Sequence, residues 1–130
     1  MLMAYKVDKK MKKVWVVEDD PGIREIIGML LEDEGYEVSL FENASQFNMA
    51  LRSQPNHIDA MVMDVMLPDG NGIHLCHKVK SSESFNNVPV LMMSANTTFC
   101  DVERFCRADD FIPKPFNIDE MAKKVSRLMA

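Results

Sequence analysis

Short apolar segments alternate with amphipathic segments along most of the chain. Residues 14–17, 58–63 and 88–93 are largely apolar runs, which is typical of strands buried on both faces of a parallel sheet. Residues 36–41 alternate between apolar and polar positions, which predicts a half-exposed strand at a sheet edge. Residues 111–112 add a short fifth strand. The apolar pattern therefore predicts five strands.

A segment with helical spacing follows each predicted strand. Asp20 directly before Pro21 has the features of an N-cap, and Gly35 is expected to end the helix that begins there. Asn43 and Asn117 each precede a helical segment in the manner of a capping box. These residues predict where three of the five helices begin.

The helical patterns differ in clarity. The pattern near residues 97–106 is the weakest of the five, whereas the last helix is expected to place Ile118, Val125 and Leu128 on its inner face. Strands that alternate with helices in this way are typical of βαβ units. The expected fold is a doubly wound α/β domain around a five-stranded parallel sheet.

Length and composition fit one such domain. The chain has 130 residues, of which 47% are hydrophobic and 27% charged, so one domain is expected, from residue 13 to 130, after an N-terminal extension of residues 1–12. A net charge of −5 argues against nonspecific nucleic-acid binding, and the apolar runs fall far short of the roughly 20 residues that cross a bilayer. Three cysteines without a CxxC pair predict neither a disulfide framework nor a zinc site, which favours a reducing cytoplasm.

Polar residues follow four of the predicted strands. Glu18 and Asp19 follow the first strand, Asp64 the third, Ser94 the fourth and Lys114 the fifth. In open parallel sheets, ligands bind at the carboxyl ends of the strands, so these side chains are expected to line one crevice. Three converging carboxylates repel one another unless a cation compensates them, and Mg²⁺ prefers oxygen ligands of this kind. A lysine and a hydroxyl beside that cation are suited to binding a phosphoryl group.

Asp64 is the candidate nucleophile of this predicted phosphoryl-transfer site. Aspartate can form a covalent aspartyl phosphate, and Asp64 lies between the acidic pair and the residues that would contact phosphate. A cluster of His74, Cys76 and His77 is better explained as ordinary helix residues, because Cys76 is expected to face the core while the histidines do not.

Four segments resemble the receiver domain of two-component response regulators. They are Val16-Val17-Glu18-Asp19-Asp20, the segment from Met63 to Gly70 (Met-Asp-Val-Met-Leu-Pro-Asp-Gly), Met93-Ser94-Ala95, and the segment from Ala108 to Phe116 (Ala-Asp-Asp-Phe-Ile-Pro-Lys-Pro-Phe). The resemblance covers residues 13–129. It implies a flavodoxin-like (βα)5 fold with strand order 2-1-3-4-5.

The resemblance also assigns roles to individual residues. It makes Asp64 the phosphoacceptor, with Ser94 and Lys114 contacting the phosphoryl group. Mg²⁺ would be held by Asp64 and by three further groups: Glu18, Asp19 and the backbone carbonyl of Met66. Ser94 and Phe111 would form the conformational switch, and the peptide bond between Lys114 and Pro115 would be cis.

The resemblance implies partners as well as chemistry. A sensor histidine kinase or a histidine phosphotransfer protein would supply the phosphoryl group. A downstream protein, or an output domain outside this sequence, would bind the face formed by the fourth helix, the fifth strand and the fifth helix, with no direct contact to nucleic acid or membrane. The domain would act as a signalling module that catalyses only its own phosphorylation and dephosphorylation.

Two departures and two rival hypotheses qualify this interpretation. Phe111 stands where Tyr is common, and Arg107 stands where a small residue, usually Gly, precedes Ala-Asp-Asp. One rival is a Mg²⁺-dependent phosphohydrolase with Asp64 as its nucleophile, but such enzymes typically place a second acid two residues on, where this chain has Met66. The other rival is an interaction module that is never phosphorylated, and the presence of all five site residues argues against it.

Overall fold

The chain folds around a five-stranded parallel sheet. The computed structural model describes residues 11–53, 55, 57–96 and 99–130, so part of the predicted extension, residues 1–12, and the predicted start of the fourth helix lie outside the described residues. The strands are β1 (Lys13–Val17), β2 (Glu37–Phe41), β3 (Ala60–Asp64), β6 (Val90–Ser94) and β7 (Asp110–Pro113). Their order is β2-β1-β3-β6-β7, and every neighbouring pair is parallel, which confirms the predicted topology.

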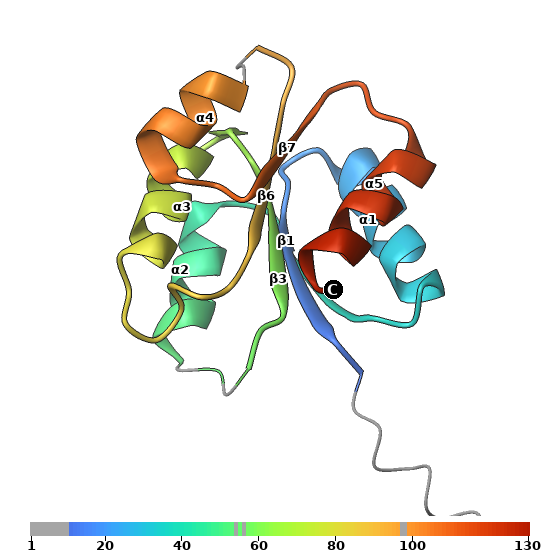
Figure 1. The fold of residues 1–130 in the computed structure, drawn as a ribbon, viewed down its shortest axis with the longest axis horizontal. Coiled ribbons are helices and arrows are strands. Elements are labelled where there is room, and N and C mark those ends of the chain that lie inside the picture. Colours follow the sequence, from blue (N-terminus) through green and yellow to red (C-terminus); the bar gives the residue numbers. More distant parts are fainter. Residues whose placement is uncertain (1–10, 54, 56, 97–98) are drawn as a thin grey trace, which may run out of the picture.

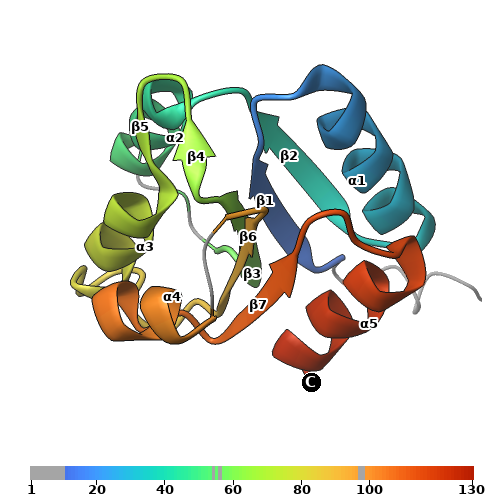
Figure 2. The ribbon, with the colours of Figure 1, turned by 90° about the horizontal axis from the view of Figure 1, so that it is seen from above.

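Helices cover both faces of the sheet (Figure 1). They are α1 (Pro21–Asp33), α2 (Ala44–Arg52), α3 (Gly72–Lys80), α4 (Phe99–Cys106) and α5 (Ile118–Leu128). Figure 2 looks along the strands and places α1 and α5 on one side of the sheet, with α2, α3 and α4 on the other. The molecule is therefore a three-layer α/β/α sandwich.

The alternation of side chains along each strand produces two separate cores. In β1, Val14 and Val16 face the α1 and α5 side, where they pack with Ile27. Trp15 and Val17 face the opposite side and pack with residues from α2, α3 and α4. The central strands are buried on both faces, as the continuous apolar runs predicted.

The predicted helix caps are confirmed. The carboxylate of Asp20 accepts a hydrogen bond from the Ile23 N–H, and Asn43 accepts one from the Gln46 N–H. Asn117 accepts hydrogen bonds from the first turn of α5. These side chains satisfy backbone donors that have no partner within the helix, so the local sequence determines where the helices begin.

A short hairpin after β3 was not predicted as strands. β4 (Met66–Leu67) and β5 (Gly70–Asn71) pair antiparallel beyond the end of the main sheet. At their turn, the carboxylate of Asp69 accepts hydrogen bonds from the N–H groups of Ala44 and Ser45, at 2.8 and 2.9 Å. The hairpin thereby caps the first turn of α2, whose Ala44 and Ser45 lie 25 and 24 residues before Asp69 in the chain.

One expectation about side-chain burial and one about strand ends need correction. Ile118 was expected on the inner face of α5 but is half exposed, because Met121 and Val125 fill the inner positions of that helix. β3 and β6 each begin two residues later and end one residue later than predicted, so Asp64 and Ser94 are the last residues of their strands rather than the first residues of loops. Among the described residues, no helix is both long and apolar enough to cross a membrane.

The Asp69 cap gives a pH-dependent prediction. The hydrogen bond from the Ala44 N–H lowers the pKa of Asp69, the loss of hydration opposes this effect, and the Ser45 N–H adds to the lowering. A lowered carboxyl pKa stabilises the fold above the pKa of the unfolded chain, and this stabilisation is lost as the pH falls through the folded pKa. We therefore expect wild type to exceed Asp69→Asn in free energy of unfolding at neutral pH and to lose this advantage as the pH falls below the ordinary pKa of an aspartate, about 3.9.

Urea unfolding followed across that pH range measures the difference. Glu25→Gln removes a charge from an exposed position of α1 and serves as the control. A difference between wild type and Asp69→Asn that stays constant from neutral to acid pH would contradict the proposed cap.

Candidate functional site

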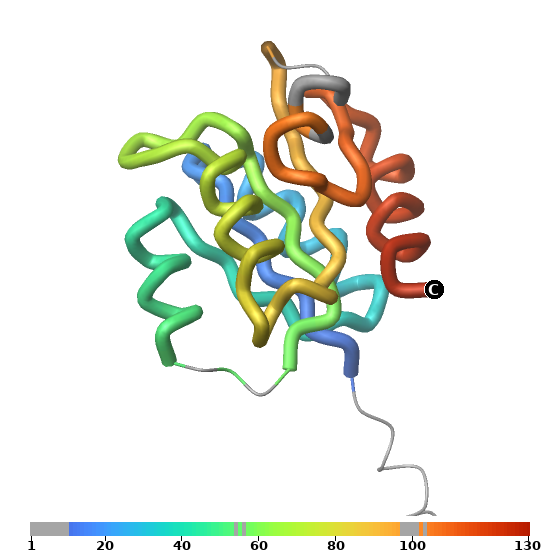
Figure 3. The backbone as a smooth tube through the Cα atoms, turned by 60° about the vertical axis from the view of Figure 1, so that its left-hand side comes forward, coloured from blue at the N-terminus to red at the C-terminus, as the bar shows by residue number. Residues whose placement is uncertain are grey.

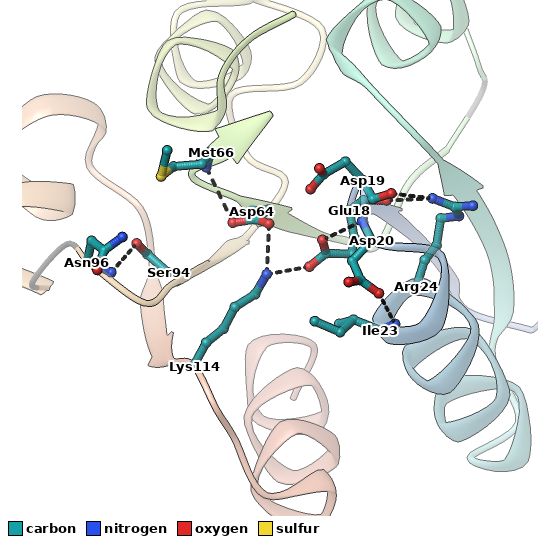
Figure 4. Close-up of polar contacts among 10 residues, drawn as sticks. All are labelled: Glu18, Asp19, Asp20, Ile23, Arg24, Asp64, Met66, Ser94, Asn96 and Lys114. Carbon is teal, nitrogen blue, oxygen red and sulfur yellow. Dashed lines mark hydrogen bonds and ion pairs between the residues drawn. The ribbon is translucent and has the colours of Figure 1, made fainter. Parts of the chain in front are cut away.

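The ends of three strands bring four charged side chains together (Figure 4). Glu18 and Asp19 follow β1, Asp64 ends β3, and Lys114 follows β7. Glu18, Asp19 and Asp64 each offer one carboxylate oxygen, and these three oxygens lie within 4.8 Å of one another. The structure thus brings together the acidic residues that the sequence singled out.

Lys114 is the cation that links two of these acids. Its Nζ donates to Glu18 Oε1 at 2.6 Å and to Asp64 Oδ2 at 2.8 Å. Both acids are buried, at 0% and 5% exposure, so neither carboxylate can rely on water to stabilise its charge. The backbone of Lys114 is held beside β6 because its backbone N–H donates to the carbonyl of Ser94 at 2.9 Å.

Burial and ion pairing act in opposite directions on these groups. Burial raises the pKa of Glu18 to about 7, although the hydrogen bonds from Lys114 and from the Asp20 N–H lower it and the charge of Asp64 adds to the rise. Burial also lowers the pKa of Lys114, but its hydrogen bonds to Asp64 and Glu18 outweigh this, so its pKa is raised overall. Lys114 therefore stays charged, while burial disfavours the charged form of Glu18 despite its ion pair with Lys114.

Backbone contacts hold the acidic pair in place. Glu18 Oε2 accepts a hydrogen bond from the Asp20 N–H at 3.0 Å. Arg24 in α1 donates through one guanidinium nitrogen to the carbonyls of Glu18 at 2.9 Å and Asp19 at 3.2 Å. The sequence analysis missed Arg24. The only available signal was a basic residue in the first turns of the helix that follows the acidic pair.

The remaining predicted residues lie around Asp64. Ser94 is buried at the end of β6, and its Oγ accepts a hydrogen bond from the Asn96 N–H at 3.1 Å. The Met66 N–H donates to Asp64 Oδ1 at 3.3 Å, and the Met66 side chain is exposed. Phe111 in β7 is partly buried against the core that α4 shares with α2 and α3.

The backbone after β7 has the expected isomer. The peptide bond between Lys114 and Pro115 is cis. Beside it, an apolar groove of about 390 Å³ is lined by Ile23, Ile26, Ala95, Lys114, Pro115, Phe116 and Ile118. The half-exposed Ile118 thus belongs to the rim of the site rather than to the core.

The set of donors fits a hard divalent cation. Three carboxylates and one ammonium leave a formal charge of two negative when all four groups are ionised. Carboxylate and carbonyl oxygens are the ligands that Mg²⁺ prefers, and a second compensating charge would oppose the rise in the pKa of Glu18. The residues present therefore fit Mg²⁺ on the chemistry of the donors alone.

Comparisons with known proteins show which family the chain resembles along most of its length. The family model described as "Response regulator receiver domain" matches residues 14–126. The chain is 32% identical over 122 residues to the DNA-binding response regulator MtrA of Mycolicibacterium smegmatis, covering 92% of this chain and 51% of that protein. The chain spans about half the length of the curated relatives it matches.

Solved structures show the same fold. The chemotaxis response regulator CheY4 of Vibrio cholerae has a TM-score of 0.80 and 26% identity, with 92% of this chain and 99% of that chain covered. The response regulator TrrA of Thermotoga maritima, in complex with Mg(2+)-BeF, has a TM-score of 0.78 and 27% identity, with 91% and 99% covered. The sequence of the chain, its strand order and these likenesses lead to one conclusion: it belongs to the response regulator receiver domain family of two-component signalling.

Proposed function

We propose that this receiver domain accepts a phosphoryl group on Asp64 from a phosphohistidine of a sensor histidine kinase or a histidine phosphotransfer protein. The observation that carries the proposal is the position of the Asp64 carboxylate, which lies between the acidic pair and Ser94 and is bound by Lys114. We propose residues 13–130 as the phosphoacceptor domain and residues 1–12 as an extension.

The transfer exchanges one bond to phosphorus for another. A carboxylate oxygen of Asp64 forms the new P–O bond, while the P–N bond breaks and its electron pair stays on the imidazole of the donor. The transferred group carries negative charge on its three equatorial oxygens. Lys114 and Ser94 would contact these oxygens, with the ammonium supplying charge and the hydroxyl a hydrogen bond.

A metal site completes this arrangement. Glu18, Asp19, Asp64 and the carbonyl of Met66 would hold Mg²⁺, directly or through water. When bound, Mg²⁺ neutralises developing charge on the phosphoryl oxygens. The presence of Mg(2+)-BeF in the T. maritima relative supports this cofactor for the present chain.

The chemistry that we propose is confined to the domain itself. After transfer, water can attack the aspartyl phosphate and restore the Asp64 carboxylate, so the domain catalyses its own dephosphorylation. Met66 occupies the position two residues after Asp64 where a phosphohydrolase would need an acid, and a methionine thioether cannot exchange protons. Signalling is therefore better supported than hydrolysis of an external substrate.

The switch that we propose runs from Ser94 to Phe111. A phosphoryl group adds up to two negative charges and new hydrogen-bond acceptors, so it would draw the Ser94 hydroxyl towards it. This movement would open space below α4, into which Phe111 could rotate from β7. Ser94 and Phe111 lie on adjacent strands, since β6 and β7 are paired.

The output of the switch would lie on the face of α4, β7 and α5. A downstream protein, or an output domain in a longer protein, would bind this face. The DNA-binding relative MtrA is about twice the length matched here, which supports an output that resides outside the receiver domain. We propose no direct contact of the receiver with nucleic acid or membrane, and a cytoplasmic location.

Mg²⁺ should stabilise the fold by mass action. At ten times its dissociation constant, a ligand that binds only the folded state adds about 1.4 kcal/mol, which raises the Tm of a domain of this size by several degrees. We expect this shift in wild type and its loss in Asp19→Asn. A thermal melt with and without millimolar Mg²⁺ measures it, and the fluorescence of buried Trp15 gives a second readout.

Asp20→Asn is the matched control. Asp20 lies next to Asp19 but caps α1, and asparagine is an equally good N-cap. The proposed metal site is wrong when Mg²⁺ shifts the melting of wild type and Asp19→Asn by the same amount.

One phosphoryl group should appear on Asp64 after incubation with acetyl phosphate and Mg²⁺. Asp64→Asn should abolish it, because an amide oxygen is a poor nucleophile. Lys114→Ala should slow it by about 100-fold, the usual cost of removing one group that stabilises transition-state charge. Intact-mass spectrometry measures the yield.

The control for the lost lysine is Lys124→Ala. Lys124 pairs with Asp110, away from the acidic site, and its removal should leave the rate unchanged. Phosphorylation of Asp64→Asn at undiminished yield would show that the acceptor is another residue.

A beryllofluoride complex, which mimics the phosphoryl group, should test the switch. We expect the amide exchange rates to change in residues 94–111 and on the exposed face of α5. The changes in residues 36–52 should be much smaller. Ser94→Ala should weaken the response, whereas Ser84→Ala, at an exposed serine, should retain it. Changes confined to the loops around Asp19 and Asp64 would contradict the proposed switch.

A further inference from the structure

Two cysteines that are far apart in the sequence meet inside the molecule. Cys76 lies in α3 and Cys106 is the last residue of α4, and these helices are neighbours on the same face of the sheet (Figures 1 and 3). The Cys76 thiol donates to the carbonyl of Cys106 at 3.4 Å, and the Cys106 thiol donates to the carbonyl of Val102 at 3.2 Å. Both cysteines are reduced and buried, at 0% and 1% exposure.

We propose that Cys76 and Cys106 form a modification site, at which a hydroperoxide oxidises the two thiols to a disulfide that ties α3 to α4. The Cys76 thiol already contacts Cys106 across the interface of the two helices. Both side chains belong to the same core, on the side of the sheet that α3 and α4 cover.

The surroundings give the two sulfurs different roles. The hydrogen bond between the two thiols and burial both raise the pKa of Cys76. The same hydrogen bond lowers the pKa of Cys106, burial opposes this, and the Ala108 N–H and the charge of Lys80 support it. Cys106 is therefore the thiol that loses its proton more readily, and Cys76 is the partner that can resolve its oxidation.

The reaction balances with hydrogen peroxide as the two-electron oxidant. The Cys106 thiolate attacks one peroxide oxygen, the O–O bond breaks, and a sulfenic acid and water are formed once a proton is taken up. The Cys76 sulfur then attacks the Cys106 sulfur, the S–O bond breaks, and a second water leaves with the Cys76 proton. Two thiols and one peroxide give one disulfide and two water molecules.

Access to the pair depends on the end of α4. The helix has eight residues, too few to be stable without its tertiary contacts, and Cys106 is its last residue. Arg107, which follows, is exposed and has a φ of 55°, a left-handed conformation that costs a non-glycine residue free energy. Opening of this last turn would expose Cys106 to a small oxidant while the sheet stays intact.

The cross-link would limit the movement of α4. The closed loop from Cys76 to Cys106 contains β6 and therefore Ser94. If α4 moves as the proposed function requires, oxidation would restrain that movement, and this consequence rests on the proposed function. Formation of the cross-link does not depend on the proposed function. Asp64→Asn should therefore form the disulfide as readily as wild type does.

Peroxide treatment followed by peptide mapping tests the site. The test uses the Cys100→Ser variant of the full chain, so that only two thiols remain. After millimolar hydrogen peroxide and alkylation in denaturant, we expect a peptide pair linked through Cys76 and Cys106 and the loss of both alkylation sites. The oxidised protein should melt at least about 5 °C higher, and dithiothreitol should reverse the shift.

Cys76→Ser in the same background is the matched control. Serine retains a donor for the Cys106 carbonyl, so the fold should persist, and Cys76→Ala serves if it does not. Either variant should yield a sulfenic acid on Cys106 that dimedone traps. The proposal is overturned when both thiols of the Cys100→Ser variant remain open to alkylation under peroxide that oxidises Cys100 in wild type, or when Cys106 is oxidised without becoming linked to Cys76.

Discussion

The burial of two carboxylates around a single lysine is the constraint on which the site depends. Lys114 lies 96 residues after Glu18 and 50 residues after Asp64, so its two ion pairs join the first, third and last strands of the sheet. Removing one member of a buried ion pair leaves the other charge without compensation, which costs far more than the pair gains in stability. The site is therefore part of the fold's own electrostatic balance.

That balance is incomplete without a further cation. Asp19 adds a third carboxylate to the pair of buried acids, and among the described residues Lys114 is the only ammonium that pairs with these acids. Burial raises the pKa of Glu18, the charge of Asp64 adds to the rise, and the contact with Lys114 offsets it only in part. An arrangement that tolerates such a cost is suited to binding a metal ion and an incoming phosphoryl group, because both relieve or use the unbalanced charge.

The two cores of the sandwich divide the molecule into regions of different character. On the α1 and α5 side, Ile27 and Met121 pack against β1, β3 and β6, and Arg24 fixes the loop that carries the acidic pair. On the other side lie α4 and the thiols of Cys76 and Cys106. A helix of eight residues such as α4 is more easily displaced than the sheet beneath it, so conformational change is expected on this side.

Local sequence predicted the five strands of the main sheet, their alternation with helices and three of the helix caps, because hydrophobic periodicity and capping act over a few residues, whereas the strand order was implied by the family resemblance. The five polar residues at the strand ends, from Glu18 to Lys114, were also predicted, since parallel strands bring their carboxyl ends to one edge. Side-chain geometry was decided only by the tertiary structure. The exposure of Ile118, the cap that Asp69 provides to α2, the contact of Arg24 with two carbonyls, and the meeting of Cys76 with Cys106 each depend on how separate elements pack. Nothing in the neighbouring sequence encodes such contacts, because distance along the chain does not fix distance across a core.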